Sequence, residues 1–108
     1  MTVEQHDVVD FVARNPDKKI TALVISDHLS WDNVNEHLLC LQEKLNCYFR
    51  YVQSGELIEK YPDALNDKVA FEIVLEHSPP DAAFWFFEKA RATTEAAGLA
   101  LSWRVLEL

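Results

Sequence analysis

Residues 68–106 have the sequence KVAFEIVLEHSPPDAAFWFFEKARATTEAAGLALSWRVL, the clearest structural pattern in the chain. Residues 68–77 place an apolar side chain at every second position, which predicts a β-strand with one buried face. Ser78, two prolines and an aspartate form a helix-start signal, and Gly98 is a typical helix stop. Alternation resumes over residues 99–106, so the stretch predicts a β-α-β unit.

The N-terminal half adds three elements. Two apolar runs, residues 8–13 and 20–26, flank an Asn-Pro-Asp turn and predict a β-hairpin. Apolar residues at steps of three and four over residues 34–52 predict an amphipathic helix, with Ser30 or Asp32 as its N-cap.

The resulting order β-β-α-β-α-β defines the fold class. Right-handed β-α-β connections make the second, third and fourth strands parallel, and the hairpin makes the first strand antiparallel to its partner. We predict an α+β two-layer sandwich, with a four-stranded mixed sheet and two helices packed on one face. It forms a single domain over residues 1–108, and the order of the strands across the sheet is left open.

The composition excludes several function classes. The chain has 18 Asp and Glu against 10 Lys and Arg, a net charge of −8, which repels phosphate backbones and argues against a nucleic-acid partner. Two glycines are too few for a Gly-rich phosphate loop, so Rossmann and P-loop nucleotide sites are excluded. No cofactor is indicated.

Neither a signal peptide nor a membrane span is expected. The start MTVEQHDVVDF lacks a basic region followed by an apolar run, and no apolar stretch approaches the ~20 residues of a spanning helix. We therefore expect a cytoplasmic protein without a membrane partner, in which Cys40 and Cys47 stay reduced. Their positions along one helix suit neither a mutual disulfide nor a zinc site.

Polar side chains are expected to gather at one edge of the sheet. The second and third strands end at this edge and both long helices begin there, as in many α/β ligand sites. The candidate ligand-edge residues are Asp27, His28, Trp31, Asp32 and His77, with Glu36 and His37 one helical turn further in. Such residues can hold a divalent metal or act as a general acid and base. Helix capping and solvated strand ends also explain them, and no metal motif such as H-E-x-x-H is present.

Apolar side chains are expected on the surface of both helices. Residues 84–87 are four consecutive aromatics, which one sheet cannot bury together. A helical wheel directs one set of side chains at the core: Ala83, Phe87, Ala90, Thr94 and Ala97. Exposed aromatics beside small residues are typical of association surfaces, although single exposed apolar residues are also ordinary. The interface candidates are Trp85, Ala92, Ala96, Cys40, Cys47 and Tyr51.

Three segments carry a family resemblance: ISDHLSWD, HLLCLQEKLNCYFRYVQSGELIEKYPDA and VAFEIVLEHSPP. They resemble a bacterial family of stand-alone proteins of about this length that is classified only as a domain of unknown function. The ISDHLxW and LQEKLN motifs are the most specific parts, and the resemblance spans nearly the whole chain. It implies a bacterial cytoplasmic setting, and it transfers no activity, cofactor or catalytic residue.

The sequence favours a non-catalytic protein that acts by association, either with itself as a homodimer or with another protein. An acidic surface speeds encounter with a basic partner, but a charge of −8 is also ordinary for solubility. The alternative is a metal- or small-ligand-binding protein, or an acid/base enzyme, using the Asp27/His28/His77 edge. Catalytic residues are not assigned.

Overall fold

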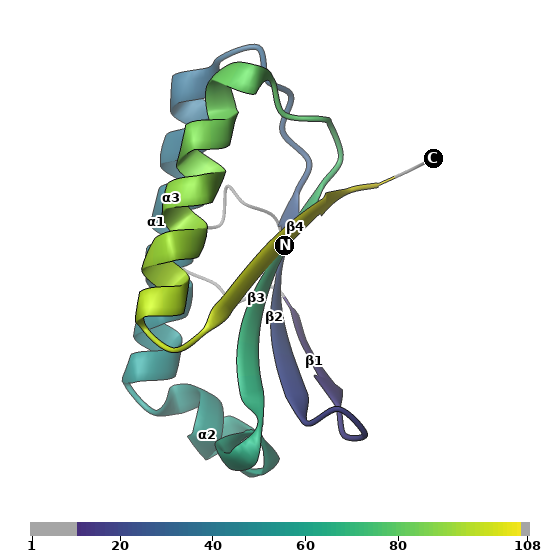
Figure 1. Ribbon diagram of the computed structural model, residues 1–108, viewed down its shortest axis with the longest axis vertical. Helices are drawn as coiled ribbons and strands as arrows, with labels where there is room; N and C mark the ends of the chain where they lie inside the picture. Colours follow the sequence, from purple (N-terminus) through teal and green to yellow (C-terminus); the bar gives the residue numbers. More distant parts are fainter. Residues whose placement is uncertain (1–10, 107–108) are drawn as a thin grey trace.

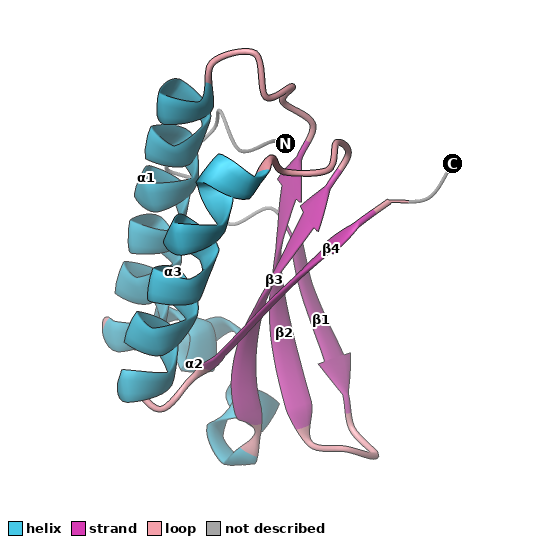
Figure 2. Ribbon diagram, turned by 45° about the horizontal axis from the view of Figure 1, so that its top comes forward, coloured by secondary structure: helices cyan, strands magenta, loops and turns pink. Residues whose placement is uncertain are grey.

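The computed structural model describes residues 11–106 and has the predicted α+β architecture. The four strands form one sheet and are β1 (Phe11–Asn15), β2 (Ile20–Asp27), β3 (Lys68–Leu75) and β4 (Ala100–Val105). The α-helices are α1 (Val34–Gln53), the short α2 (Glu56–Lys60) and α3 (Phe84–Ala96). Figure 1 shows α1 and α3 side by side on one face of the twisted sheet, and Figure 2 shows the same two layers from a second direction.

The strand pairing confirms the predicted mixed sheet. β1 pairs antiparallel with β2, whereas β2 with β3 and β3 with β4 pair in parallel. The order across the sheet is β1-β2-β3-β4, identical to the order along the chain. Since β2 and β3 end at the same edge, α1 and α3 both start there and run parallel to each other.

The core lies between the sheet and the two long helices. Alternate side chains of the central strands face the helices and are completely buried, among them Leu23, Ile25, Phe71 and Ile73. Full burial of such a side chain contributes about 1.5–3 kcal/mol, which makes this layer the main source of stability. Tyr48 of α1 is buried as well. Its hydroxyl is satisfied there because it donates to a carbonyl oxygen of β2 at 2.6 Å.

The starts of both long helices differ from the prediction: α1 has a different N-cap, and α3 begins later. The N-cap of α1 is Asn33, whose Oδ1 accepts the Glu36 backbone N–H at 3.1 Å, and neither Ser30 nor Asp32 takes that role. A 3-10 turn over Asp81–Ala83 precedes α3, so α3 does not begin at Ser78. The two consecutive prolines explain the delay, because a proline keeps the residue before it out of the helical region.

The first strand also differs from its predicted bounds. The prediction covered residues 8–13, of which 8–10 lie outside the described residues. Within the described part, β1 extends to Asn15, because Arg14 and Asn15 continue the register opposite Thr21 and Ile20.

Both glycines lie where helices end, as predicted. Gly55 follows α1 with φ +87°, and Gly98 follows α3 with φ +80°. Past the end of α3, the Gly98 N–H donates to the Glu95 carbonyl at 2.9 Å and the Leu99 N–H to the Thr94 carbonyl at 3.1 Å. These bonds satisfy the last carbonyls of the helix, and the positive φ that they require favours glycine.

None of the helices within residues 11–106 combines the length and apolarity needed to cross a bilayer.

Candidate functional site

Two of the predicted edge residues, Asp27 and Trp31, meet around His37 where β2 ends and α1 begins. The side chains of Asp27 and His37 are at most 2% exposed. His37 Nε2 hydrogen-bonds to the Asp27 carboxylate, and His37 Nδ1 lies 3.0 Å from the Ser30 carbonyl oxygen. The Trp31 indole stacks on the imidazole with ring centroids 3.7 Å apart. This cluster fastens the end of the strand to the first turn of the helix.

The hydrogen-bond partners determine where the protons lie. A carbonyl oxygen only accepts, so His37 Nδ1–H donates to Ser30. His37 Nε2 and Asp27 Oδ2 then share one proton, while Asp27 Oδ1 accepts the Leu29 backbone N–H at 3.0 Å. Burial raises the pKa of the Asp27 carboxyl above its ordinary value of 3.8, and the hydrogen bond to His37 offsets part of that rise. Both ring nitrogens of His37 are therefore engaged inside the protein.

The other ligand-edge residues, His28, Asp32 and His77, have exposed side chains. The Asp32 carboxylate accepts the Ser30 hydroxyl at 3.0 Å, and the His77 carbonyl oxygen accepts the Trp31 indole N–H at 3.0 Å. Within residues 11–106, no three His, Cys, Asp or Glu side chains are placed to hold a metal ion together. Of the predicted residues, Asp27 and His37 thus form a buried pair, whereas the other ionisable side chains point into solvent. The set does not converge on one ligand position.

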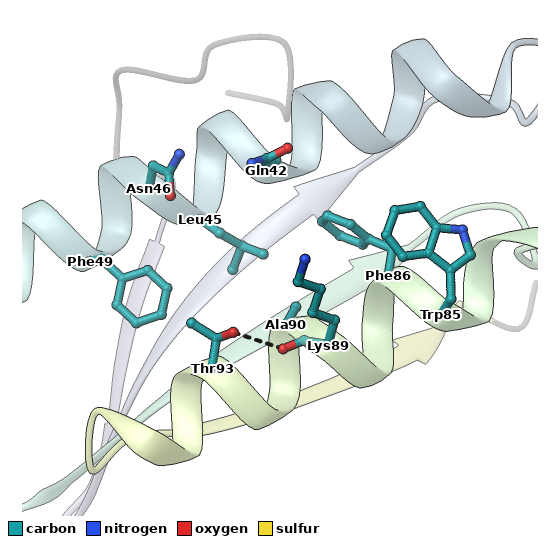
Figure 3. A pocket seen from close by; sticks show the side chains of 9 residues that line it. All are labelled: Gln42, Leu45, Asn46, Phe49, Trp85, Phe86, Lys89, Ala90 and Thr93. Atoms are coloured by element: carbon teal, nitrogen blue, oxygen red, sulfur yellow. Dashed lines mark hydrogen bonds between the residues drawn. The ribbon is translucent and has the colours of Figure 1, made fainter.

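A groove with a volume of about 240 Å³ lies between α1 and α3 and opens on the outer side of the helix layer. Figure 3 shows Leu45 and Phe49 of α1 turned toward α3, and the Lys89 amine extending from α3 toward α1. The lining combines apolar and polar side chains from both helices: Gln42, Leu45, Asn46, Phe49, Trp85, Phe86, Lys89, Ala90 and Thr93. The groove therefore offers an apolar interior with amide, hydroxyl and ammonium groups around it.

Three of the interface candidates lie on the outer face of α3. Trp85 is 59% exposed and lines the groove, and Ala92 and Ala96 are exposed along the same side of the helix. The neighbouring Phe86 is buried, and its ring meets the Trp85 indole edge-on at a centroid distance of 6.1 Å. Trp85 is thus held against the groove wall while most of its surface stays in solvent.

The other three candidates, Cys40, Cys47 and Tyr51, are half-buried and pack against the core. They are less exposed than an interface needs, because the buried arc of this helix is wider than its leucine stripe and includes Lys44, and their place in an interface stays a prediction. Both cysteines remain thiols in the part of the chain that the structure describes. On α3, Ala97 is exposed and not directed at the core, because the chain leaves the helix at that residue.

A polar cluster that the sequence did not suggest lies near the opposite end of the sheet. Arg14 Nε donates to Asp67 Oδ2 at 2.6 Å, and the Thr21 hydroxyl donates to the same oxygen at 2.8 Å. The hydrogen bond from Arg14 lowers the pKa of the Asp67 carboxyl below its ordinary value. All these donors and acceptors are used within the cluster, which joins β1 and β2 to the loop before β3.

A model of the family of unknown function DUF6572 matches residues 1–107. The chain belongs to the DUF6572 family. This agrees with the predicted resemblance to a domain of unknown function that spans nearly the whole chain. No curated protein and no solved structure matches this DUF6572 chain.

Proposed function

We propose that this protein acts by binding another protein chain through the outer face of its helix layer and has no catalytic role at the strand-end edge. The groove between α1 and α3, with Trp85 exposed along it, is the observation that supports the proposal. An exposed tryptophan beside small residues is the composition of an interface centre, where Trp is enriched among residues that dominate binding energy.

The geometry of the strand-end edge gives no comparable support to the enzyme alternative. A general base needs a nitrogen or oxygen that can reach a substrate proton. Both His37 nitrogens already bond to Asp27 and Ser30, and Trp31 covers the ring. Asp27 is buried against His37, whereas His28 and His77 are exposed, so the three residues of the alternative do not share one environment. The proposal therefore assigns the Asp27–His37 pair a structural role. A bacterial cytoplasmic setting is part of the same proposal.

Site-specific photo-cross-linking in the native cells tests the proposal. A benzophenone amino acid replaces Ala92 on the outer face of α3, and in a control protein it replaces Ser102, an exposed residue of β4 on the side of the sheet away from α1 and α3. We expect covalent adducts from position 92 and none from position 102. Trp85→Ala should abolish the adducts, because truncation of a central interface aromatic commonly costs about 2 kcal/mol or more of binding energy.

Phe84→Ala is the matched control for Trp85→Ala, because Phe84 is also an exposed aromatic of α3 but does not line the groove. It should leave the adducts in place. Absence of adducts from position 92, or adducts that persist in the Trp85→Ala protein, would contradict the proposal.

A further inference from the structure

The helix layer carries an apolar projection in addition to the groove. Leu39 of α1 is 55% exposed and does not line the groove. Glu36, three residues earlier, is exposed on the same side of the helix. Leu39 and Glu36 together form the α1 knob.

The chemistry of the groove complements that of the α1 knob. Leu45, Phe49 and Phe86 give the groove apolar walls, which suit a branched aliphatic side chain such as Leu39. Lys89 is the one charged side chain among the described residues that line it, and its ammonium is opposite in sign to the Glu36 carboxylate. The helix face of one molecule thus carries both partners of an apolar contact, the knob and the groove, and both partners of an ion pair.

The α1 knob and the groove lie on the same side of α1. Leu39 precedes Asn46, a groove residue, by two helical turns, so both project from one side of the helix about 10 Å apart along its axis. A two-fold axis can lie in the plane of this face, midway between the knob and the groove. Rotation about this axis places the knob of each copy over the groove of the other copy. Both contacts then form at once, as an isologous dimer interface requires.

We propose that the occupant of the groove is a second copy of this chain. In this symmetric dimer Leu39 enters the groove of the other copy, and Glu36 faces the partner's Lys89. The molecule measures 40 × 28 × 26 Å, so its helix face can supply the roughly 800 Å² per partner of a stable interface. This inference rests on the proposed function and names the partner for the same surface.

Sedimentation equilibrium with charge-reversal variants tests the dimer. Lys89→Glu places two like-charged pairs in the homodimer, and so does Glu36→Lys, so each variant alone should dimerise at least about tenfold more weakly than wild type. A mixture of the two variants forms a heterodimer in which one contact is the native Glu36–Lys89 pair and the other is the same pair with its two charges exchanged. We expect the mixture to regain the wild-type dissociation constant within about threefold.

The mixing design separates folding from binding, because a variant that fails to fold cannot rescue its partner. Lys18→Glu, in the exposed β1–β2 turn, makes the same charge change away from the helix face and should sediment like wild type. Wild type that stays monomeric at about 1 mM would overturn the dimer. So would a mixture that remains as weak as its components.

The mass of the photo-adduct distinguishes the two proposals. A position-92 adduct with twice the mass of the chain supports the dimer. An adduct of another mass, with monomeric wild type, overturns the dimer and leaves the protein-binding surface standing. No adduct and no dimer would overturn both.

Discussion

Asp27 and His37 are ionisable side chains that the fold has removed from water and satisfied internally. The imidazole bonds to the Ser30 carbonyl on one side and to the Asp27 carboxyl on the other, and that carboxyl also accepts a backbone N–H. Breaking such a buried pair costs more than the pair itself contributes, because the remaining group loses its partner without regaining water. The consequence of a substitution at Asp27 therefore depends on whether the new side chain preserves the hydrogen bonds.

We expect Asp27→Asn to retain the stability of the wild-type protein at pH 7 to within about 1 kcal/mol. The asparagine amide can donate to His37 Nε2, and its carbonyl oxygen can accept the Leu29 N–H. Asp27→Leu has a similar shape but offers neither group, so it should lose about 3 kcal/mol. Urea unfolding of the three proteins measures the difference. Equal losses in both variants would contradict the structural role of these hydrogen bonds.

The pH dependence of the same variants has a definite sign. The folded-state pKa of Asp27 is raised above 3.8, so this carboxyl favours folding fully below pH 3.8 and progressively less as the pH rises through its folded value. Asparagine does not titrate. The stability of Asp27→Asn relative to wild type should therefore increase as the pH rises from about 3 toward neutrality. Thermal unfolding across this range checks it, and a relative decrease would contradict the raised pKa.

Helices and strands were predictable from the sequence wherever one periodic pattern decided them. The alternation of Phe71, Ile73 and Leu75 identified β3 and its buried face, and the leucine stripe identified α1 and its core side. The strand order was not predictable, because the same pattern of elements is compatible with several arrangements. The cap of α1 was misplaced because Ser30, Asp32 and Asn33 are all suitable caps, and only tertiary packing chose Asn33.

The candidate site was predictable only in part. The edge where Asp27 and Trp31 lie follows from the topology, but the pairing of Asp27 with His37 depends on how far α1 is rotated about its axis. The groove depends on the distance between α1 and α3, whose side chains, among them Leu45 and Phe86, line it. Neither quantity is encoded in local periodicity.

The end of α3 allows a test at a single glycine. A Cβ at Gly98 would meet no atom within 4 Å, so only its backbone conformation, with φ +80°, resists substitution. Gly98→Ala should therefore cost about 1–2 kcal/mol, the penalty of a left-handed conformation for alanine. Gly98→Asn should cost less, because asparagine tolerates this region. Denaturant unfolding measures both, and a Gly98→Ala protein as stable as wild type would contradict the assignment.

The molecule as a whole presents two unlike surfaces. α1 and α3 cover one face of the sheet (Figure 1), and the other face carries small and branched apolar residues such as Ala22, Val24 and Val74. Parallel strands are generally covered on both faces, but among the described residues α1 and α3 cover only one face of this sheet, so copies must be kept apart at the other face. Arg104 Nε donates to the Glu72 carboxylate at 2.7 Å on this face and interrupts the apolar surface with opposite charges.

We expect this ion pair to contribute to solubility more than to stability. Replacing both residues, Glu72→Val with Arg104→Val, leaves the net charge unchanged and joins the valines into one patch. The free energy of unfolding should change by less than about 1 kcal/mol, because exposed ion pairs contribute little. The variant should nevertheless form large aggregates, which light scattering detects. The matched variant Glu72→Gln with Arg104→Gln should stay soluble, and aggregation of both variants, or of neither, would contradict this role.

The sheet order β1-β2-β3-β4 also bears on how the molecule is made. Every strand pairs with the strand that precedes it in the chain, so no strand has to be inserted between two that are already paired. During synthesis the β1–β2 hairpin can form first, and each later β-α unit can add to the growing edge as it leaves the ribosome. The last strand to emerge, β4, pairs with β3 alone and becomes one edge of the sheet. The chain can therefore assemble in the order of its own translation.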